Sequence, residues 1–225
     1  MIYFKKSQPA PASLADKKSY READVIERIH DDFKNKCYLC ETLAPTSINV
    51  EHFIPHRGND DLKYNWDNLF YACSHCNNTK EMLERDSEFK GGFLNCTHEE
   101  DRVDERISYR VYSFPIAIVV IEKAEISDEE YSVRVENTIT LLDAIYNGYK
   151  TSIKKIEAEN IRTAILNEID TFQNLLIEMV TAKSSAEKDD LIKKVRNCLK
   201  NDTAFTAFKR WIVKDNPELK SMIEI

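Results

Sequence analysis

Two cysteine pairs, Cys37-Tyr-Leu-Cys40 and Cys73-Ser-His-Cys76, bracket the segment that contains Val50-Glu-His-Phe-Ile-Pro-His56. Each CxxC pair is typical of a knuckle that directs two thiolates at one ion, and Zn²⁺ takes four ligands in a tetrahedron. Two pairs with 32 residues between them therefore predict one structural zinc site formed by Cys37, Cys40, Cys73 and Cys76. The alternatives are two unrelated pairs of buried thiols or a redox CxxC, which would be expected beside a βαβ pattern.

A zinc ion with four thiolates has no open position, so this site is expected to be structural rather than catalytic. His75, inside the second knuckle, could replace a cysteine, but with four cysteines present it is expected to face solvent. Cys96 and Cys198 stand alone and are expected to be free, partly buried thiols.

Residues between and just after the knuckles carry groups suited to phosphodiester hydrolysis. If zinc joins the knuckles, Glu51 and His52 on a strand come close to a helix that starts near Asn77. A neutral imidazole accepts a proton near pH 7, and carboxylate and amide oxygens suit a hard ion such as Mg²⁺. A lone histidine is more often structural, but a Glu-His pair between two knuckles predicts a catalytic site.

The order and spacing of these elements resemble the HNH (ββα-metal) endonuclease family with cysteine knuckles. The family fold is a β-hairpin followed by a helix around one divalent ion, so the resemblance implies Mg²⁺ or another divalent metal as catalytic cofactor. The resemblance covers residues 37–80 and rests on Cys37-x2-Cys40, Glu51-His52-x2-Pro55, Asn68-Leu69 and Cys73-x2-Cys76-Asn77-x2-Lys80.

The resemblance also implies a role for each matching residue. His52 would be the general base that activates water, and Glu51 and Asn77 would ligate the catalytic metal. Asn68 would orient His52 or tie down the loop through hydrogen bonds. Lys80 would contact a substrate phosphate.

The chain departs from the family pattern after Pro55, where relatives often carry a lysine and then a small or glycine-rich run. Here the sequence is His56-Arg57-Gly58. Arg57 is a candidate phosphate contact, because a guanidinium binds phosphate oxygens in a bidentate manner. His56 either assists at the metal or phosphate or is simply exposed.

A narrower resemblance lies outside these motifs. The opening Met1-Ile-Tyr-Phe-Lys-Lys6 and residues 137–148, with Thr151 following, are similar to the HNH nuclease subunit (PtuB) of Septu-type antiphage systems. That subunit family also occurs in retron-linked systems. The resemblance implies an ABC/RecF-like ATPase partner (PtuA-like) that carries or controls the nuclease in an antiviral defence complex.

The charge balance limits how a nucleic acid could be bound. Residues 1–90 hold 13 basic and 15 acidic side chains, residues 91–225 hold 19 and 24, and the net charge is −7. Neither part has the excess of Lys and Arg that neutralising phosphates requires. A nucleic-acid substrate is therefore expected to be held by a metal and a few cations, or to be presented by a partner.

Composition and segment lengths predict a cytoplasmic protein with no membrane partner. The chain is 42% hydrophobic and 32% charged over 225 residues, which allows a substantial core. No segment approaches the roughly 18 apolar residues of a membrane span. The first residues lack the features of a signal peptide.

Hydrophobic patterning predicts an α+β chain in three parts. Residues 1–36 form an N-terminal arm and a helix from about Asp16 to Asn35. Residues 37–92 form the HNH module that the resemblance implies, with its structural zinc. Residues 93–225 are mixed and then mainly helical, and they are expected to bind a partner or to form a homodimer.

The third part begins with predicted strands and continues with helices. Strands are predicted at residues 107–111, 116–121 and 131–135, and helices from Thr138 onward. Three apolar stripes at helical spacing are expected to be core or subunit interface. They are Ile165, Ile169, Phe172 and Leu176; Leu191, Ile192, Val195 and Leu199; and Phe205, Phe208, Trp211 and Ile212.

Three functions follow from the sequence. The favoured one is a metal-dependent DNA endonuclease that acts as the effector of an antiviral complex. The second is an RNase, for example one that cuts tRNA in a retron-type system, because HNH chemistry does not settle the polymer. The third is a non-catalytic zinc-knuckle binding module, which would not require Glu51, His52 and Asn77 together.

Overall fold

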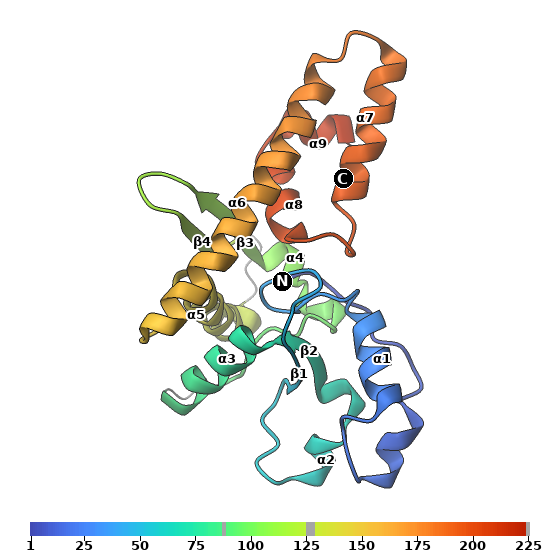
Figure 1. Cartoon of the computed structure of the whole chain (residues 1–225), viewed down its shortest axis with the longest axis vertical. Helices are drawn as coiled ribbons and strands as arrows, with labels where there is room; N and C mark the ends of the chain where they lie inside the picture. The colour runs from blue at the N-terminus through green and yellow to red at the C-terminus, as the bar shows by residue number, and fades with distance from the viewer. Residues whose placement is uncertain (87–88, 125–128, 224–225) are drawn as a thin grey trace.

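The computed structural model of the chain describes residues 1–86, 89–124 and 129–223. Within these residues, two two-stranded antiparallel sheets combine with helices that dominate the C-terminal part (Figure 1). The predicted α+β fold with a helical C-terminal region is confirmed. In chain order the elements are α1 (Ala23–Asp32), β1 (Ile48–His52), α2 (Asp60–Lys63), β2 (Leu69–Cys73), α3 (Ser74–Asp86), α4 (Val103–Arg106), β3 (Ile107–Tyr112), β4 (Ile118–Lys123), α5 (Ser132–Asn147), α6 (Ser152–Thr181), α7 (Ser185–Cys198), α8 (Thr206–Lys214) and α9 (Pro217–Ile223).

The first sheet is the hairpin of β1 and β2, paired from Ile48 opposite Cys73 to His52 opposite Leu69. β2 is buried along its whole length, whereas β1 is partly exposed. α3 follows β2 without a loop and starts at Ser74, three residues before the predicted start. The junction of β2 and α3 therefore carries the second cysteine pair.

The N-terminal helix is shorter than predicted. α1 starts at Ala23, whereas the prediction placed its start near Asp16. Lys17 adopts a left-handed conformation with φ of 50° after a short 3-10 helix, and the buried face of the helix begins only at Val25. The residues between are held in a non-helical path by local contacts, including the Ser13 hydroxyl, which donates to the carboxylate of Asp24 at 2.6 Å.

The first residues of the chain are extended, as expected for an arm, but they lie inside the protein. Met1, Ile2 and Phe4 are no more than 1% exposed and belong to the main hydrophobic core. The backbone N–H of Phe4 donates to the carbonyl of Cys96 at 2.8 Å. The arm is therefore a core element, which its mixed apolar and basic sequence did not reveal.

The second sheet pairs β3 with β4, as predicted, with boundaries shifted by one or two residues. The predicted strand at residues 131–135 is wrong, because α5 starts at Ser132. Val135, Thr138, Leu142 and Ile145 are all buried, at the spacing of one helix face. β-branched residues favour strands only weakly, and packing of this face against the core overrides that preference.

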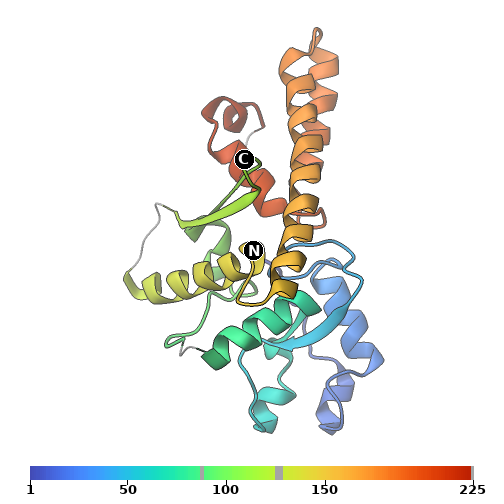
Figure 2. The ribbon, with the colours of Figure 1, turned by 60° about the vertical axis from the view of Figure 1, so that its left-hand side comes forward.

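The helical region contains a long helix, α6, whose far half projects together with α7 (Figures 1 and 2). The apolar stripes predicted from the sequence form core here. Glycine is required at 148, since φ is 94° and an added Cβ would lie 2.9 Å from the Cα of Lys155 at the start of α6. A second hydrophobic cluster joins α6, α7, α8 and α9 and contains Phe172, Leu176, Met179, Leu191, Val195, Leu199, Val213, Leu219 and Ile223.

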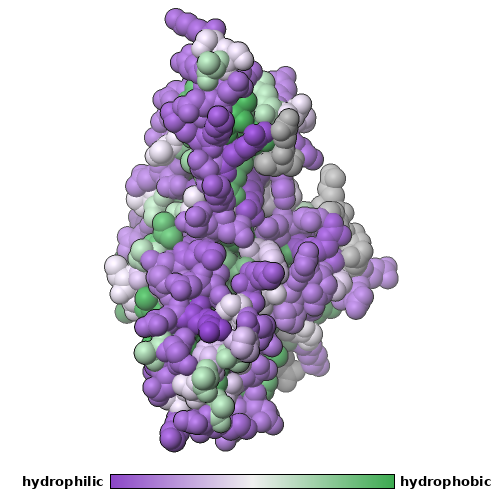
Figure 3. Space-filling model, turned by 90° about the vertical axis from the view of Figure 1, so that its right-hand side faces the viewer, coloured by the Kyte–Doolittle hydropathy of each residue, from purple (hydrophilic) through white to green (hydrophobic). Residues whose placement is uncertain are grey.

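The face shown in Figure 3 is mainly hydrophilic, with apolar side chains in small separate patches. Among the helices of the described residues, none combines the length and the apolar character that crossing a bilayer requires.

Candidate functional site

The four predicted cysteines meet at one point. Cys37 and Cys40 lie in the loop after α1, Cys73 ends β2 and Cys76 lies in the first turn of α3. All four are buried, and their Sγ atoms lie within 4.8 Å of one another. The knuckle turn is closed by the N–H of Glu41, which donates to the Cys37 carbonyl at 2.9 Å.

The geometry of this cluster suits a tetrahedral zinc ion. Sulfurs that bind one zinc at about 2.3 Å lie about 3.8 Å apart in a tetrahedron. The Sγ atoms of Cys40 and Cys73 are 3.8 Å apart. Burial raises the pKa of the Cys37 thiol, but hydrogen bonds from the three neighbouring cysteines outweigh it and hold that pKa well below its usual range. The same hydrogen bonds among the thiols, together with burial, raise the pKa of Cys40 and of Cys76 well above the usual range. The spacing and full burial of the four sulfurs are therefore what indicate a metal site.

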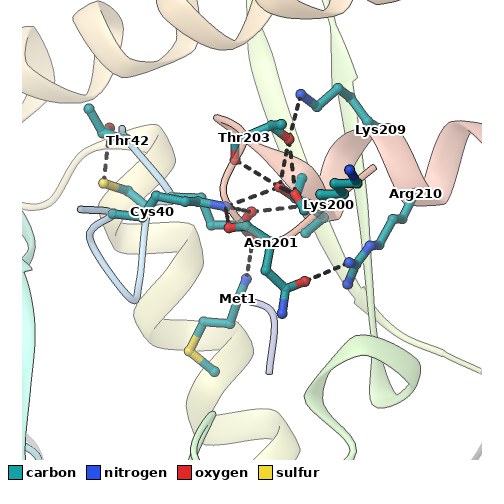
Figure 4. A network of polar contacts seen from close by, with 12 residues as sticks. Met1, Cys40, Thr42, Lys200, Asn201, Thr203, Lys209 and Arg210 are labelled. Atoms are coloured by element: carbon teal, nitrogen blue, oxygen red, sulfur yellow. Dashed lines mark hydrogen bonds and ion pairs between the residues drawn. The ribbon is translucent and has the colours of Figure 1, made fainter. Parts of the chain in front are cut away.

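A buried charge cluster ties the first knuckle to the C-terminal helices. Figure 4 shows Met1, Asn201 and Thr203 around it, while the Cys40 side chain points away from it toward Thr42. The carboxylate of Glu41 lies 3.0 Å from the α-ammonium of Met1 and 3.4 Å from Nζ of Lys36. Burial opposes its ionisation, but these two ammonium groups lower the pKa of Glu41 to about 2.

Both members of the Lys36–Glu41 pair also bind the chain around α8. The N–H of Ala207 donates to Glu41 Oε2 at 3.1 Å. Nζ of Lys36 donates to the Asn201 carbonyl at 3.1 Å and to the Thr206 hydroxyl at 3.0 Å. The knuckle and α8 are therefore held together by a pair of buried charges.

Glu41→Gln is expected to lower the free energy of unfolding by about 3–5 kcal/mol, because it leaves the Lys36 ammonium buried without this carboxylate. A folded-state pKa near 2 lies below the unfolded-state pKa, so the carboxylate stabilises the fold above the unfolded pKa and loses this effect as pH falls toward 2. Urea denaturation should therefore give the same loss at any pH from about 5 to 8. Adding Lys36→Met should recover part of the loss. A single variant within about 0.5 kcal/mol of wild type would contradict the expectation.

His52 ends β1 and is half-buried. Its Nε2 lies 3.0 Å from the carbonyl oxygen of Lys63, at the end of α2. A carbonyl can only accept a hydrogen bond, so Nε2 carries the proton and Nδ1 keeps a free lone pair. Burial is the main cause that lowers the pKa of His52 below its ordinary value, so the ring is neutral at pH 7.

Glu51, the residue before His52, forms a buried ion pair with Lys80 of α3. Nζ of Lys80 lies 2.8 Å from Glu51 Oε1 and 3.2 Å from Glu84 Oε1, and it donates to the His52 carbonyl at 3.3 Å. Burial raises the pKa of Glu51 to about 7, although the ammonium of Lys80 opposes this. Lys80 is only 1% exposed. Its predicted phosphate contact stays a prediction, since in this structure the ammonium faces two carboxylates inside the protein.

Asn77 is partly buried in the first turn of α3, three residues before Lys80. Residues three apart lie on the same face of a helix. Asn77 is therefore one turn from Lys80 along α3, and its Nδ2 donates to Oδ1 of Asn78 at 3.5 Å rather than contacting Glu51. Two carboxyl groups, Glu51 and Glu84, meet one ammonium here, and burial raises the pKa of Glu51 to about 7. A hard divalent cation fits this set of oxygen donors.

Asn68 fixes the loop that follows β1. It is 4% exposed, and its Oδ1 accepts from the N–H of Ile54 at 2.7 Å. Its Nδ2 donates to the carbonyls of Ile54 and Leu62, both at 2.9 Å. Of the two roles the sequence left open, this geometry corresponds to tying down the loop, with no direct contact to His52.

Asn68→Ala is expected to destabilise the protein by about 1–3 kcal/mol, because it leaves buried backbone groups at Ile54 and Leu62 without partners. Hydrogen exchange measured by mass spectrometry should show faster exchange in peptides that cover residues 53–68. The knuckle around Cys37 should exchange at the wild-type rate. Unchanged exchange in the loop would show that Asn68 does not hold it.

The departure from the family pattern, His56-Arg57, lies beside His52. The rings of His56 and His52 have centroids 4.7 Å apart, and Nδ1 of His56 accepts from the N–H of Gly58 at 3.1 Å. Arg57 is exposed and lines a groove of about 370 Å³ that Phe53 and Glu84 also line. The structure thus brings both side chains to the edge of the site.

His75 does not face solvent, so that expectation is wrong. It is 8% exposed, its Nδ1 lies 2.9 Å from a carboxylate oxygen of Glu157 and its Nε2 lies 2.9 Å from the carbonyl of Ile145. α5 and α6 cover the first turn of α3, where His75 lies. The imidazole therefore joins the second knuckle to the helical region.

One residue at the site was missed by sequence reasoning. Tyr20 packs edge-on against His52, with ring centroids 4.6 Å apart and planes at 75°. It lies in Lys17-Lys-Ser-Tyr-Arg21, where an aromatic residue is surrounded by basic ones. That composition is typical of nucleic-acid contacts and is the signal that could have drawn attention to it.

Comparison with known proteins agrees with the motif. No curated protein matches the chain. Residues 29–82 match the model of the HNH endonuclease family, and this range contains the four cysteines, β1, β2 and most of α3, but not Tyr20. The chain thus carries an HNH endonuclease domain at residues 29–82.

Proposed function

We propose that the chain is a metal-dependent endonuclease that hydrolyses phosphodiester bonds of DNA. The observation that carries the proposal is the state of His52 at the end of the strand that carries Glu51. Its Nε2 donates to the Lys63 carbonyl, and within the described part of the chain its Nδ1 has no hydrogen-bond partner. A neutral imidazole with one nitrogen fixed and the other free is the arrangement that a general base needs.

In this proposal each residue near the strand end has a separate task. Nδ1 of His52 takes a proton from the attacking water, and the Lys63 carbonyl stabilises the ring as it becomes charged. Asn68 holds the backbone at Ile54, so the end of β1 keeps its position. Lys80 orients the Glu51 carboxylate through their 2.8 Å contact.

Two metals fit the donor groups of the site. Cys37, Cys40, Cys73 and Cys76 would hold zinc, whose contribution is to fix the knuckles to the start of α3. Glu51 and Asn77 would hold Mg²⁺ or a similar ion, which supplies positive charge beside the phosphate and the leaving oxygen.

We further propose that the nuclease is a cytoplasmic effector in an antiviral complex with an ATPase partner. Support comes from the resemblance of residues 1–6 and 137–151 to the Septu-type subunit and from the net charge of −7, which suits a nuclease that receives its substrate from a partner. Met1, Phe4, Leu142 and Ile145 in these stretches are buried. The resemblance therefore supports a shared architecture more directly than a shared partner.

The test is a cleavage assay of the full chain with Mg²⁺ on plasmid DNA and, in parallel, on total tRNA. Nicked or linear plasmid with 5′-phosphate ends, abolished by a chelator and by His52→Ala, would support the proposal. Cleavage of tRNA alone would assign the activity to RNA. Failure of both polymers to be cut, with Mg²⁺ or Mn²⁺ and with the candidate partner added, would overturn it.

A further inference from the structure

The segment before the matched HNH region runs alongside the loop that follows His52. This segment, residues 7–21, contains a short 3-10 helix and then a turn. Side-chain contacts tie it to the loop at three places before it reaches His52. These contacts are Ser7 with Trp66, Gln8 with Asp67, and Lys17 with Asp61.

At the end of this segment, Tyr20 restricts the imidazole of His52. The rings of Tyr20 and His52 meet edge-on, with centroids 4.6 Å apart. The ring of His56 also packs against the His52 ring, with centroids 4.7 Å apart. The third contact is the hydrogen bond of Nε2 to the Lys63 carbonyl. Three contacts from separate parts of the chain therefore set the plane of the ring and the direction of its free nitrogen.

Arg21 extends from the same turn into solvent. Its N–H donates to the hydroxyl of Ser19 at 3.0 Å, and its guanidinium lies 5.2 Å from the ring centroid of Tyr20. Across residues 1–86, 89–124 and 129–223, no carboxylate forms an ion pair with Arg21. Arg21 thus contacts the ring of Tyr20, which in turn contacts His52, the proposed base. Its exposed guanidinium, with no carboxylate paired to it, is suited to bind the oxygens of a phosphate.

The turn presents exposed cations beside the site, although residues 16–24 hold three basic and three acidic side chains and therefore no net charge. The net charge of the chain is −7, yet Lys18 and Arg21 are exposed on this segment, and Arg57 is exposed on the loop that follows β1. The side chain of Lys18 is 82% exposed and lies 3.7 Å from Asp16, a distance at which a surface ion pair contributes little. A polyanionic backbone would find its local cations here.

We propose that residues 18–21 form a substrate-binding wall of the nuclease site. Tyr20 is a positioning residue for the His52 imidazole, and Arg21 binds a phosphate of the nucleic-acid backbone next to the bond that is cut. This inference rests on the proposed nuclease function and adds to it a segment that lies outside the matched residues 29–82.

The role of Tyr20 is tested by comparing Tyr20→Leu with Tyr20→Phe in the plasmid cleavage assay. Leucine keeps apolar volume without a ring, so kcat should fall at least about tenfold while KM stays nearly constant. Phenylalanine keeps the ring edge and should restore the wild-type kcat. ¹⁵N NMR of labelled histidine should show one tautomer of His52 in wild type and Tyr20→Phe, and a mixture in Tyr20→Leu. Equal kcat values for Tyr20→Leu and wild type would overturn this role.

The role of Arg21 is tested by binding, with cleavage switched off by His52→Ala. Arg21→Gln should weaken binding of a labelled DNA duplex in fluorescence anisotropy and reduce the slope of log affinity against log salt by about 1. Lys194→Gln removes one charge from α7, where Lys194 is 59% exposed and paired with Asp190, and should leave both values unchanged. A parallel titration with tRNA shows whether the contact serves either polymer. An unchanged salt slope in Arg21→Gln would overturn the phosphate contact.

These outcomes separate the inference from the proposed function. A wild-type chain that cleaves DNA, with Tyr20→Leu and Arg21→Gln behaving like wild type, overturns the inference alone. A chain whose cleavage is unaffected by His52→Ala overturns the proposed function. The tautomer measured by NMR does not depend on cleavage, so it tests the contact of Tyr20 with His52 in either case.

Discussion

Replacing Cys73 with serine is expected to remove the bound zinc and to unfold the HNH domain. The four sulfurs are buried within 4.8 Å of one another, so together they can surround one ion, and serine at position 73 supplies no thiolate to complete the tetrahedron. Structural zinc contributes on the order of 10 kcal/mol to folding in small domains. Whole proteins are stable by only about 5–15 kcal/mol, so this loss is comparable to the total.

The unfolding should not stop at the knuckles. Glu41 follows Cys40 directly, and its carboxylate accepts the N–H of Ala207 at the start of α8, while its carbonyl accepts the N–H of Phe205. Loss of the first knuckle therefore frees a buried carboxylate and removes contacts of α8. Circular dichroism and limited proteolysis should report loss of structure in both regions.

The control is Cys198→Ser. Cys198 lies outside the four-cysteine cluster, is only partly buried and ends α7. That variant should keep close to one zinc per chain in elemental analysis and should melt near the wild-type temperature. A soluble Cys73→Ser protein with a full complement of zinc would show that the cluster does not hold the metal.

The parts of the site that could be read from the sequence are those fixed by local spacing. The spacing of two cysteines at i and i+3 predicts a knuckle at each pair, whatever the rest of the fold is. The alternation of apolar and polar residues around Glu51 and His52 indicates a strand. The close succession of Cys73, Cys76 and Asn77 then places a helix start beside that strand. These features depend on neighbours within a few residues, so they can be predicted without knowing the fold.

The parts that could not be read depend on contacts between distant residues. Lys80 lies in a polar helical stretch and looks like a surface lysine, but it is buried because Glu51 and Glu84 surround its ammonium. His75 is buried because Glu157, 82 residues later, covers it. Such pairings leave no periodic trace in the sequence, since each partner is an ordinary polar residue in its own segment.

Backbone conformation set the limit for the helices. The predicted helix start at Asp16 is wrong because Lys17 has a positive φ, and a helix does not continue through such a residue. The lysines at this position do not reveal that conformation in the sequence. Val133 and Val135 suggest a strand by propensity, yet the core contact of Val135 is made from a helix. In both segments the helical spacing of the buried apolar residues, from Val25 in α1 and from Val135 in α5, indicates the extent of the helix better than the preferences of single residues do.

His52→Ala is expected to lower the rate of DNA cleavage by about 10²–10⁴-fold, which is the usual contribution of a general base. The fold should persist, because the side chain is half-buried and, among the residues that the structure describes, its one hydrogen bond is to the Lys63 carbonyl. Single-turnover assays on plasmid DNA should measure the rate, with zinc content and thermal melting recorded on the same samples.

His98→Ala, which changes an exposed histidine outside the HNH domain, should cleave like wild type. His56→Ala is the sharper comparison, since its ring packs against His52 but its Nδ1 is already occupied by the N–H of Gly58. If His56→Ala lost as much activity as His52→Ala while both kept zinc and fold, the assignment of a single base at position 52 would fail.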